Sequence, residues 1–447
     1  MHNNLATAAH VNRLPPEVLA KIFALSKSYC VLQAQLGVDN FTCVCKYWRQ
    51  TAMGALDLWT HIDIGPNYTS TYPADQLLHR SKNAPVHLHL FEPALKAEET
   101  VSSDRISDYG YAVEFARAFI VSHLHRVRTL CIESSNRRGR GFVSTILNLW
   151  FRRGTIEFPT SLALILPEYS DVLTVEGRSE TFENMQRMLL SVRTLHLDWA
   201  KFDWDSNVYR NLVDLRIKLN SISISQLAQI LSANPALTTL KLAVTQLVYE
   251  DGPIELPPVI LEHLEVLMAA AMKLEYVISM LSLITLPGPP IQFYGVPSSN
   301  LLKDSRFFDF CSRSKIATLY CWDGDQLPPE FFQHLPYLRT LILHNFNLST
   351  APNSQSSTTA TSLAPLSRPF DIILLGCTID FEPLKQLVIN SSTRKLQLQQ
   401  CRVRNIAGSR QDIHEIRTLL LEAYPSLQCL ISDFDSTQKL ACRRIFD

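Results

Sequence analysis

Apolar residues recur at helical spacing in two short segments near the start of the chain. In the first segment these positions are Val18, Leu19, Ile22, Phe23 and Leu25. Pro15 and Pro16 precede them and suit the first turn of a helix, where a missing N–H costs no hydrogen bond. In the second segment the apolar positions are Phe41, Val44, Cys45, Trp48 and Ala52, after the cap-type residues Asp39 and Asn40. The spacing predicts two amphipathic helices.

Further along, an apolar-x-x-apolar-x-apolar frame dominates the chain. Its clear copies have the middle apolar residues Leu195, Leu215, Leu240, Leu264, Leu319 and Leu341. Weaker copies centre on Leu88, Leu130, Leu164, Phe293, Ile372, Leu396 and Leu430. From Leu195 to Leu430 the frame recurs on average every ~26 residues, a period typical of leucine-rich repeats.

Prolines give a second signal that agrees with this frame. Pro235, Pro336 and Pro425 each stand two residues before a frame and directly after a stretch with helical spacing. Because proline ends a helix, this order predicts helix, turn and strand in each repeat. Residues 349–362 are rich in serine and threonine, and we interpret them as a polar loop insertion. The alternative to a repeat array is a general α/β domain with many leucine-rich strands.

The N-terminal helix pair resembles the F-box, the module that binds the small adaptor subunit of cullin–RING ubiquitin ligases. The resemblance rests on Leu14-Pro15-Pro16-Glu17 and on the later Val44-Cys45-Lys46-Tyr47-Trp48, and it covers residues 11–64. The tetrapeptide alone is not specific, because it recurs at residues 327–330. Residues 26–37 also separate the helices more widely than the compact F-box pattern does. An ordinary helical hairpin with a tryptophan in its core is the alternative.

Together the two patterns predict an α/β fold with two domains. Residues 11–64 would form a helical F-box-like module, and residues 65–447 an irregular leucine-rich-repeat-like solenoid with a curved parallel sheet. This combination is similar to fungal-type F-box/leucine-rich-repeat substrate receptors. The resemblance implies that the chain is not an enzyme and recruits a protein target to an SCF-type ligase through the adaptor and its cullin. The residues it implies for adaptor binding are Leu14, Pro15, Ile22, Leu25, Val44, Cys45 and Trp48. The rival hypothesis is a protein-binding repeat scaffold whose N-terminal helices only cap the array.

The composition limits the classes of binding partner and the cellular compartment that we expect. Lys+Arg and Asp+Glu are both 42 in 447 residues, so bulk charge favours neither nucleic acid nor an anionic membrane. The longest apolar run, residues 277–286, is too short to span a bilayer. Ten scattered cysteines and no signal peptide predict a reduced, cytoplasmic or nuclear protein.

The sequence contains the first residues of some motifs for catalysis or metal binding, but each of these motifs lacks a residue that it needs. His414 and Glu415 start a zinc helix, but Thr418 stands where the second histidine is needed. His87 and His89 share one strand face without further metal ligands, so we interpret that face as solvated. We therefore expect no active site, no metal and no cofactor.

The repeat frame also predicts a target-binding face. If the frame residues point inward, the residues between them point outward on the sheet. Arg216, Lys218 and Lys241 would then form a small basic cluster. Tyr320, Trp322 and Ile342 would present apolar anchors of the kind enriched in protein interfaces. The alternative is that Trp322 folds back into a neighbouring helix.

Overall fold

The computed structural model describes residues 14–26, 40–65, 74–92, 118–135, 140–153, 160–168, 172–175, 182–249, 256–270, 272–295, 301–324, 327, 331–348, 369–404 and 413–432. The interpretation of residues 349–362 as a loop lies outside this set. The chain divides into two compact units, Met1–Arg210 and Asn211–Asp447.

The first unit begins with helices and continues into a parallel sheet. Its helical elements are α1 (Pro16–Ser26), α3 (Lys46–Gly54), η3 (Leu56–Trp59), α4 (Ala74–Ser81), η4 (Leu124–Arg126), α6 (Arg140–Arg153), α7 (Phe182–Leu189) and η5 (Asn207–Tyr209). The sheet strands are β1 (His61–Ile64), β2 (Val86–Glu92), β3 (Val127–Ser134), β4 (Ser161–Ile165) and β6 (Thr194–Asp198), paired in that order. A small parallel pair joins β5 (Leu173–Val175) to β7 (Ala200–Phe202).

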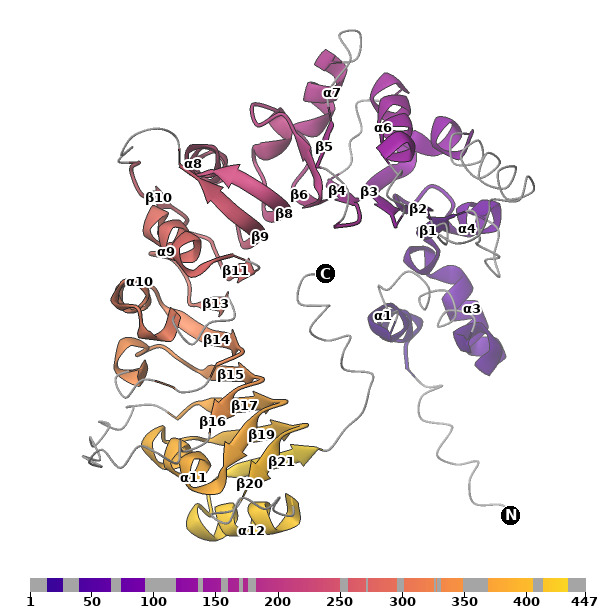
Figure 1. Cartoon of the computed structure of the whole chain (residues 1–447). Coiled ribbons are helices and arrows are strands. Elements are labelled where there is room, and N and C mark those ends of the chain that lie inside the picture. The colour runs from indigo at the N-terminus through magenta and orange to yellow at the C-terminus, as the bar shows by residue number, and fades with distance from the viewer. Residues whose placement is uncertain are drawn as a thin grey trace, which may run out of the picture. The chain divides into compact units, whose positions relative to one another are not determined.

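The second unit repeats a strand followed by a helix or a turn. Its main sheet has the order β8 (Asp214–Ser223), β9 (Thr239–Val248), β11 (Val266–Ala270), β13 (Ile291–Tyr294), β14 (Ile316–Trp322), β15 (Thr340–His344), β17 (Asp371–Leu375), β19 (Lys395–Gln399) and β21 (Gln428–Ser432). Its helical elements are α8 (Ile224–Ser232), α9 (Leu274–Leu283), η6 (Leu301–Lys303), α10 (Ser305–Arg313), η7 (Phe331–His334), α11 (Phe381–Asn390) and α12 (Ile413–Ala423). Helices α8, α9 and α10 lie on one side of these strands (Figure 1). Shorter parallel ladders join β10 (Val259–Ile260) to β12 (Ile284–Thr285), and β16 (Asn347–Leu348) through β18 (Thr378–Asp380) to β20 (Arg402–Arg404).

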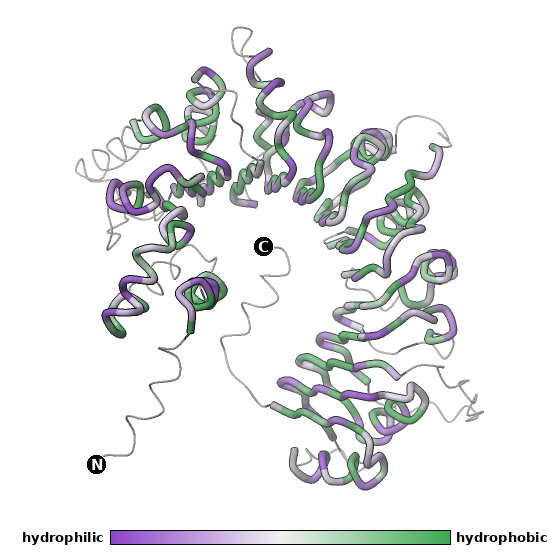
Figure 2. The backbone as a smooth tube through the Cα atoms, turned by 180° about the vertical axis from the view of Figure 1, so that it is seen from behind, coloured by the Kyte–Doolittle hydropathy of each residue, from purple (hydrophilic) through white to green (hydrophobic). Residues whose placement is uncertain are grey.

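The repeat frame builds the core of both units. Middle residues such as Leu195, Leu215, Leu240, Leu319 and Leu341 are almost fully buried. The frame centred on Leu430 is wrong, because Cys429 pairs with Leu396 and is buried, whereas Leu430 is 44% exposed. Neighbouring frames are in register, for example Leu215 with Leu240 and Leu319 with Leu341. Figure 2 shows hydrophobic stretches of the backbone interrupted by hydrophilic residues along these elements. The predicted α/β class with a large parallel sheet is therefore confirmed, whereas the leucine-rich-repeat assignment and the curvature remain predictions.

Several strands of the second unit end at the same backbone corner. Asp323, Asn345, Gly376 and Gln400 directly follow β14, β15, β17 and β19, and their φ angles are 52°, 56°, 62° and 55°. The N–H groups of the first three each donate to the last carbonyl of the next strand, at 2.9, 2.8 and 2.8 Å. The left-handed residue thus turns the chain off the sheet and still satisfies its amide.

None of the helices in the described residues combines the length and apolar composition that a membrane span needs.

Candidate functional site

The N-terminal helices form a small core of their own around three aromatic rings. On α1, Leu19 and Phe23 are fully buried. The ring of Phe23 stacks on Phe41 at a centroid distance of 4.4 Å and packs against Trp48 at 5.1 Å. The Tyr47 hydroxyl donates to the carbonyl of Leu14 at 2.5 Å and so holds the entry to α1. Trp48 is therefore a half-buried core residue, and much of its ring serves the module itself.

Cys45 separates two helical pieces that we expected to be continuous. Residues 40–44 are helical, and α3 starts anew at Lys46 with Cys45 as its N-cap. The Cys45 thiol accepts a hydrogen bond from the N–H of Trp48 at 3.4 Å, the role that serine or aspartate usually has at this position. The prediction of an unbroken helix through Cys45 is therefore wrong.

Trp59 joins the helices to the first strand. Its indole N–H donates to the carbonyl of Ala52 on α3 at 2.9 Å. The guanidinium of Arg80, on α4, lies 4.4 Å from the centre of its ring, within cation–π distance. Because Trp59 is buried and satisfied on both sides, it fixes the end of α3 against the start of the sheet.

A second apolar stripe on α1 is largely exposed to solvent. Val18, Ile22 and Leu25 follow one another at four- and three-residue spacing and are 45%, 41% and 78% exposed. On the helical turn at residues 40–44, Val44 is 58% exposed. Exposed apolar residues grouped on one small module mark an interaction surface. We call Val18, Ile22, Leu25 and Val44 the exposed stripe.

The structure thus divides the seven residues expected to contact an adaptor. Ile22, Leu25 and Val44 lie on the exposed stripe, and Pro15 is exposed beside it. Leu14, Cys45 and Trp48 are partly buried and hold the module together. Val18 was missed, although its helical spacing to Ile22 was visible in the sequence.

A different apolar surface lies on the second unit, on the sheet face opposite the buried leucines. Strand pairing aligns Met268, Tyr294, Tyr320, Ile342 and Ile373 across five neighbouring strands. We call these five residues the outer row. Tyr320 and Ile342 were expected here, whereas Met268, Tyr294 and Ile373 were missed. The same alternation predicts Tyr294 and Ile373 on this face. It fails for Met268, because the frame predicted at Leu264 and Val266 is one residue out of step with the observed pairing of Leu240 with Leu267.

Tyr320 and Trp322 differ in how they could meet a partner. Tyr320 points outward, but it is only 2% exposed because Tyr294, Trp322 and His344 surround it. Its hydroxyl is 2.8 Å from Nδ1 of His344. Trp322 is half-buried and packs with Tyr294 on a floor of Ala243, Met268 and Ala270. The alternative that Trp322 folds into a helix is therefore wrong, and Tyr320 supports this surface from below.

The expected basic cluster lies at the β8–β9 end of the same face. Arg216 is in register with Lys241, and Lys218 follows two residues later on β8. The guanidinium of Arg216 is already held by Asp214 through two contacts of 3.1 and 3.2 Å. Beyond Lys241, the outer row continues directly into Met268.

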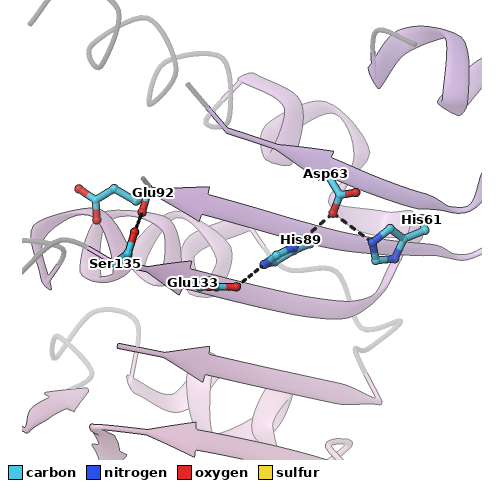
Figure 3. Close-up of polar contacts among 6 residues, drawn as sticks. All are labelled: His61, Asp63, His89, Glu92, Glu133 and Ser135. Carbon is cyan, nitrogen blue, oxygen red and sulfur yellow. Dashed lines mark hydrogen bonds and ion pairs between the residues drawn. The ribbon is translucent and has the colours of Figure 1, made fainter. Parts of the chain in front are cut away.

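In the first unit, a buried group of charges lies on the equivalent face of β1, β2 and β3 (Figure 3). Oδ1 of Asp63 is 3.0 Å from Nε2 of His61 and 3.1 Å from Nδ1 of His89. On its other side, Nε2 of His89 is 3.3 Å from Oε2 of Glu133. The side chains of Asp63 and His89 are 0% and 3% exposed. The expectation of a solvated histidine face is therefore wrong for His89, although His87 is exposed.

The charges of this group stabilise one another. Burial by itself lowers the pKa of His89, but its contacts with Asp63, Cys131 and Glu133 outweigh this effect and raise the pKa to about 12. Burial by itself raises the pKa of Asp63, but hydrogen bonds and charge from His61 and His89 lower it below 3.8. The pair is thus an imidazolium and a carboxylate at neutral pH. Within the described residues, no three His, Cys, Asp or Glu side chains are placed to share a metal ion.

Comparison with known proteins addresses the N-terminal module only. A family model described as F-box-like matches residues 11–65, which include α1, α3, η3 and β1. No curated protein matches the chain. The matched segment carries both the aromatic core and the exposed stripe. Residues 11–65 are thus similar to an F-box-like domain, and this similarity supports an F-box protein.

Proposed function

We propose that this chain is a substrate-recognition subunit of an SCF-type cullin–RING E3 ubiquitin ligase. The observation that carries the proposal is the exposed stripe on the segment that the F-box-like model matches. Its residues Ile22, Leu25 and Val44 would bury their side chains on the small adaptor subunit, and the adaptor would bind the cullin. An isolated helix pair gains nothing from such a surface, whereas a docking module requires it.

In this proposal no bond is made or broken on the chain itself. The chain holds a target protein near a ubiquitin-charged enzyme, and the rate gain comes from effective concentration. The chain therefore needs no cofactor. We place it in the cytoplasm, the nucleus or both, where these ligases operate.

We further propose that residues 65–447 form a leucine-rich-repeat-like solenoid that binds the target. The in-register leucines and the repeated strand corners support this assignment. On this solenoid Trp322 and the half-buried members of the outer row, Tyr294, Ile342 and Ile373, would contact the target, with Arg216, Lys218 and Lys241 at one end. This surface combines apolar area with charge at its border, as protein interfaces do.

The rival function is a repeat scaffold whose N-terminal helices serve only as a cap. A cap needs a polar outer face, which the exposed stripe does not provide. Size-exclusion chromatography of the full-length protein with purified adaptor separates the two functions. We expect a single co-eluting peak, and separate elution of a folded protein would refute the ligase role.

A further inference from the structure

The sheet face that carries the outer row has an apolar end and a basic end, and the distance between them is set by the sheet. Trp322 and Ile342 lie on β14 and β15, whereas Lys218 and Lys241 lie on β8 and β9. Three strand spacings separate β9 from β14 and four separate β8 from β14, about 14 and 19 Å at 4.8 Å each. An extended peptide covers about 3.3 Å per residue, so these distances correspond to roughly four to six residues.

Charge fixes the direction in which a ligand would lie. Asp323 directly follows Trp322, is exposed, and acts electrostatically on His344 at the apolar end. An acidic ligand group would be repelled there and attracted by Lys218 and Lys241 at the other end. A ligand that fits both ends is therefore itself polarised.

We propose that the outer row binds an extended segment of the target protein that crosses the strands. The segment carries an aspartate or glutamate over Lys218 and Lys241, and a large apolar side chain four to six residues away against Trp322 and Ile342. This inference rests on the proposed function, because it names the class of target that the receptor recognises.

The basic end acts through its two lysines. The planar fork of an arginine binds two oxygens of a carboxylate or a phosphate at once, whereas a lysine acts as a point charge. The fork of Arg216 already holds Asp214. The ammonium groups of Lys218 and Lys241 act as point charges that match a single carboxylate.

The test is selection of a phage library of random twelve-residue peptides on the full-length protein. We expect enriched peptides to place Asp or Glu four to six residues from Trp, Phe or Leu. A synthetic copy of an enriched peptide should bind at least tenfold more weakly to the Lys218→Glu/Lys241→Glu variant and to Trp322→Ala. Matched controls are Lys385→Glu on α11 and Tyr337→Ala, a tyrosine that is 46% exposed, and both should bind like wild type.

Several results would overturn the inference. The selection could enrich no peptides, or it could enrich peptides that lack the acidic residue or the four-to-six-residue spacing. The synthetic peptide could bind the lysine variant as tightly as the wild type, or it could bind the wild type more tightly when phosphoserine replaces its acidic residue. The lysine variant keeps the test valid even if Trp322→Ala loosens the sheet. Adaptor binding is measured on the same samples. Intact adaptor binding without peptide selection would remove this inference alone, and peptide binding without adaptor binding would remove the ligase role.

Discussion

Replacing Ile22 and Leu25 together by alanine should weaken adaptor binding without unfolding the module. Both side chains lie on the exposed stripe, whereas the fully buried residues of α1 are Leu19 and Phe23. Fully burying a leucine or isoleucine side chain is worth about 2 kcal/mol. Since 78% of Leu25 and 41% of Ile22 are exposed, an adaptor could recover about 1.6 and 0.8 kcal/mol from them. The sum of about 2.4 kcal/mol predicts a Kd that rises roughly 60-fold.

Isothermal titration calorimetry with purified adaptor measures this change directly. The control is Leu190→Ala, because Leu190 is 39% exposed but lies in the turn after α7, outside the helical module. That variant should bind like wild type. Circular dichroism should show that both variants are folded. If the double variant is folded and its Kd stays within about threefold of wild type, the exposed stripe is not the docking face.

Three further predictions concern the cores beneath these surfaces. Trp59→Phe loses the hydrogen bond to Ala52 and part of the contact with Arg80, so the free energy of unfolding from calorimetric melting should fall by about 1–2 kcal/mol. An unchanged melting temperature would contradict the role of the indole N–H. Asp63→Asn removes the buried one of the two carboxylates beside the His89 imidazolium and should cost about 3 kcal/mol in the same assay. In the wild type, the stability from Asp63 should be lost as the pH falls below 3.8. That from His89 should be lost as the pH rises from 6.5 toward 12, and in Asp63→Asn this alkaline loss should be smaller and should end at lower pH. Tyr320→Phe removes the contact with His344 but keeps the ring, so it should lower the free energy of unfolding by about 1 kcal/mol and leave peptide binding unchanged. Weaker peptide binding would mean that the hydroxyl contacts the ligand.

The sequence predicted α1 but could not separate its two apolar stripes. Val18, Leu19, Ile22, Phe23 and Leu25 all fit helical spacing. Which stripe becomes core depends on Phe41 and Trp48, which come from a later segment and stack on Phe23. The spacing of apolar residues shows that a helix has an apolar side. Which part of that side is buried depends on tertiary contacts with residues elsewhere in the chain.

The histidines of the first sheet show a different limit. Alternation placed His87 and His89 on one face correctly. From this we predicted that both side chains are exposed to solvent. Asp63 and Glu133, on the two neighbouring strands, instead surround His89 with carboxylates. Parallel pairing puts Asp63, 26 positions away in the chain, directly beside His89, whereas Glu133 is in register with Phe91 and reaches His89 diagonally. The sequence alone does not show these neighbours, because they depend on the register of the strands.

The repeated corner after the strands also bears on how such a chain can change its length. Asp323, Asn345, Gly376 and Gln400 turn the backbone in the same way, although their side chains have little in common. Two corners of equal geometry are equivalent points for recombination, because a crossover between them adds or removes one whole strand-and-turn unit. Such an exchange keeps the inward and outward alternation of every remaining strand. The corner, more than the leucine frame, therefore marks the unit by which a protein of this kind can be lengthened, shortened or redesigned for a new target.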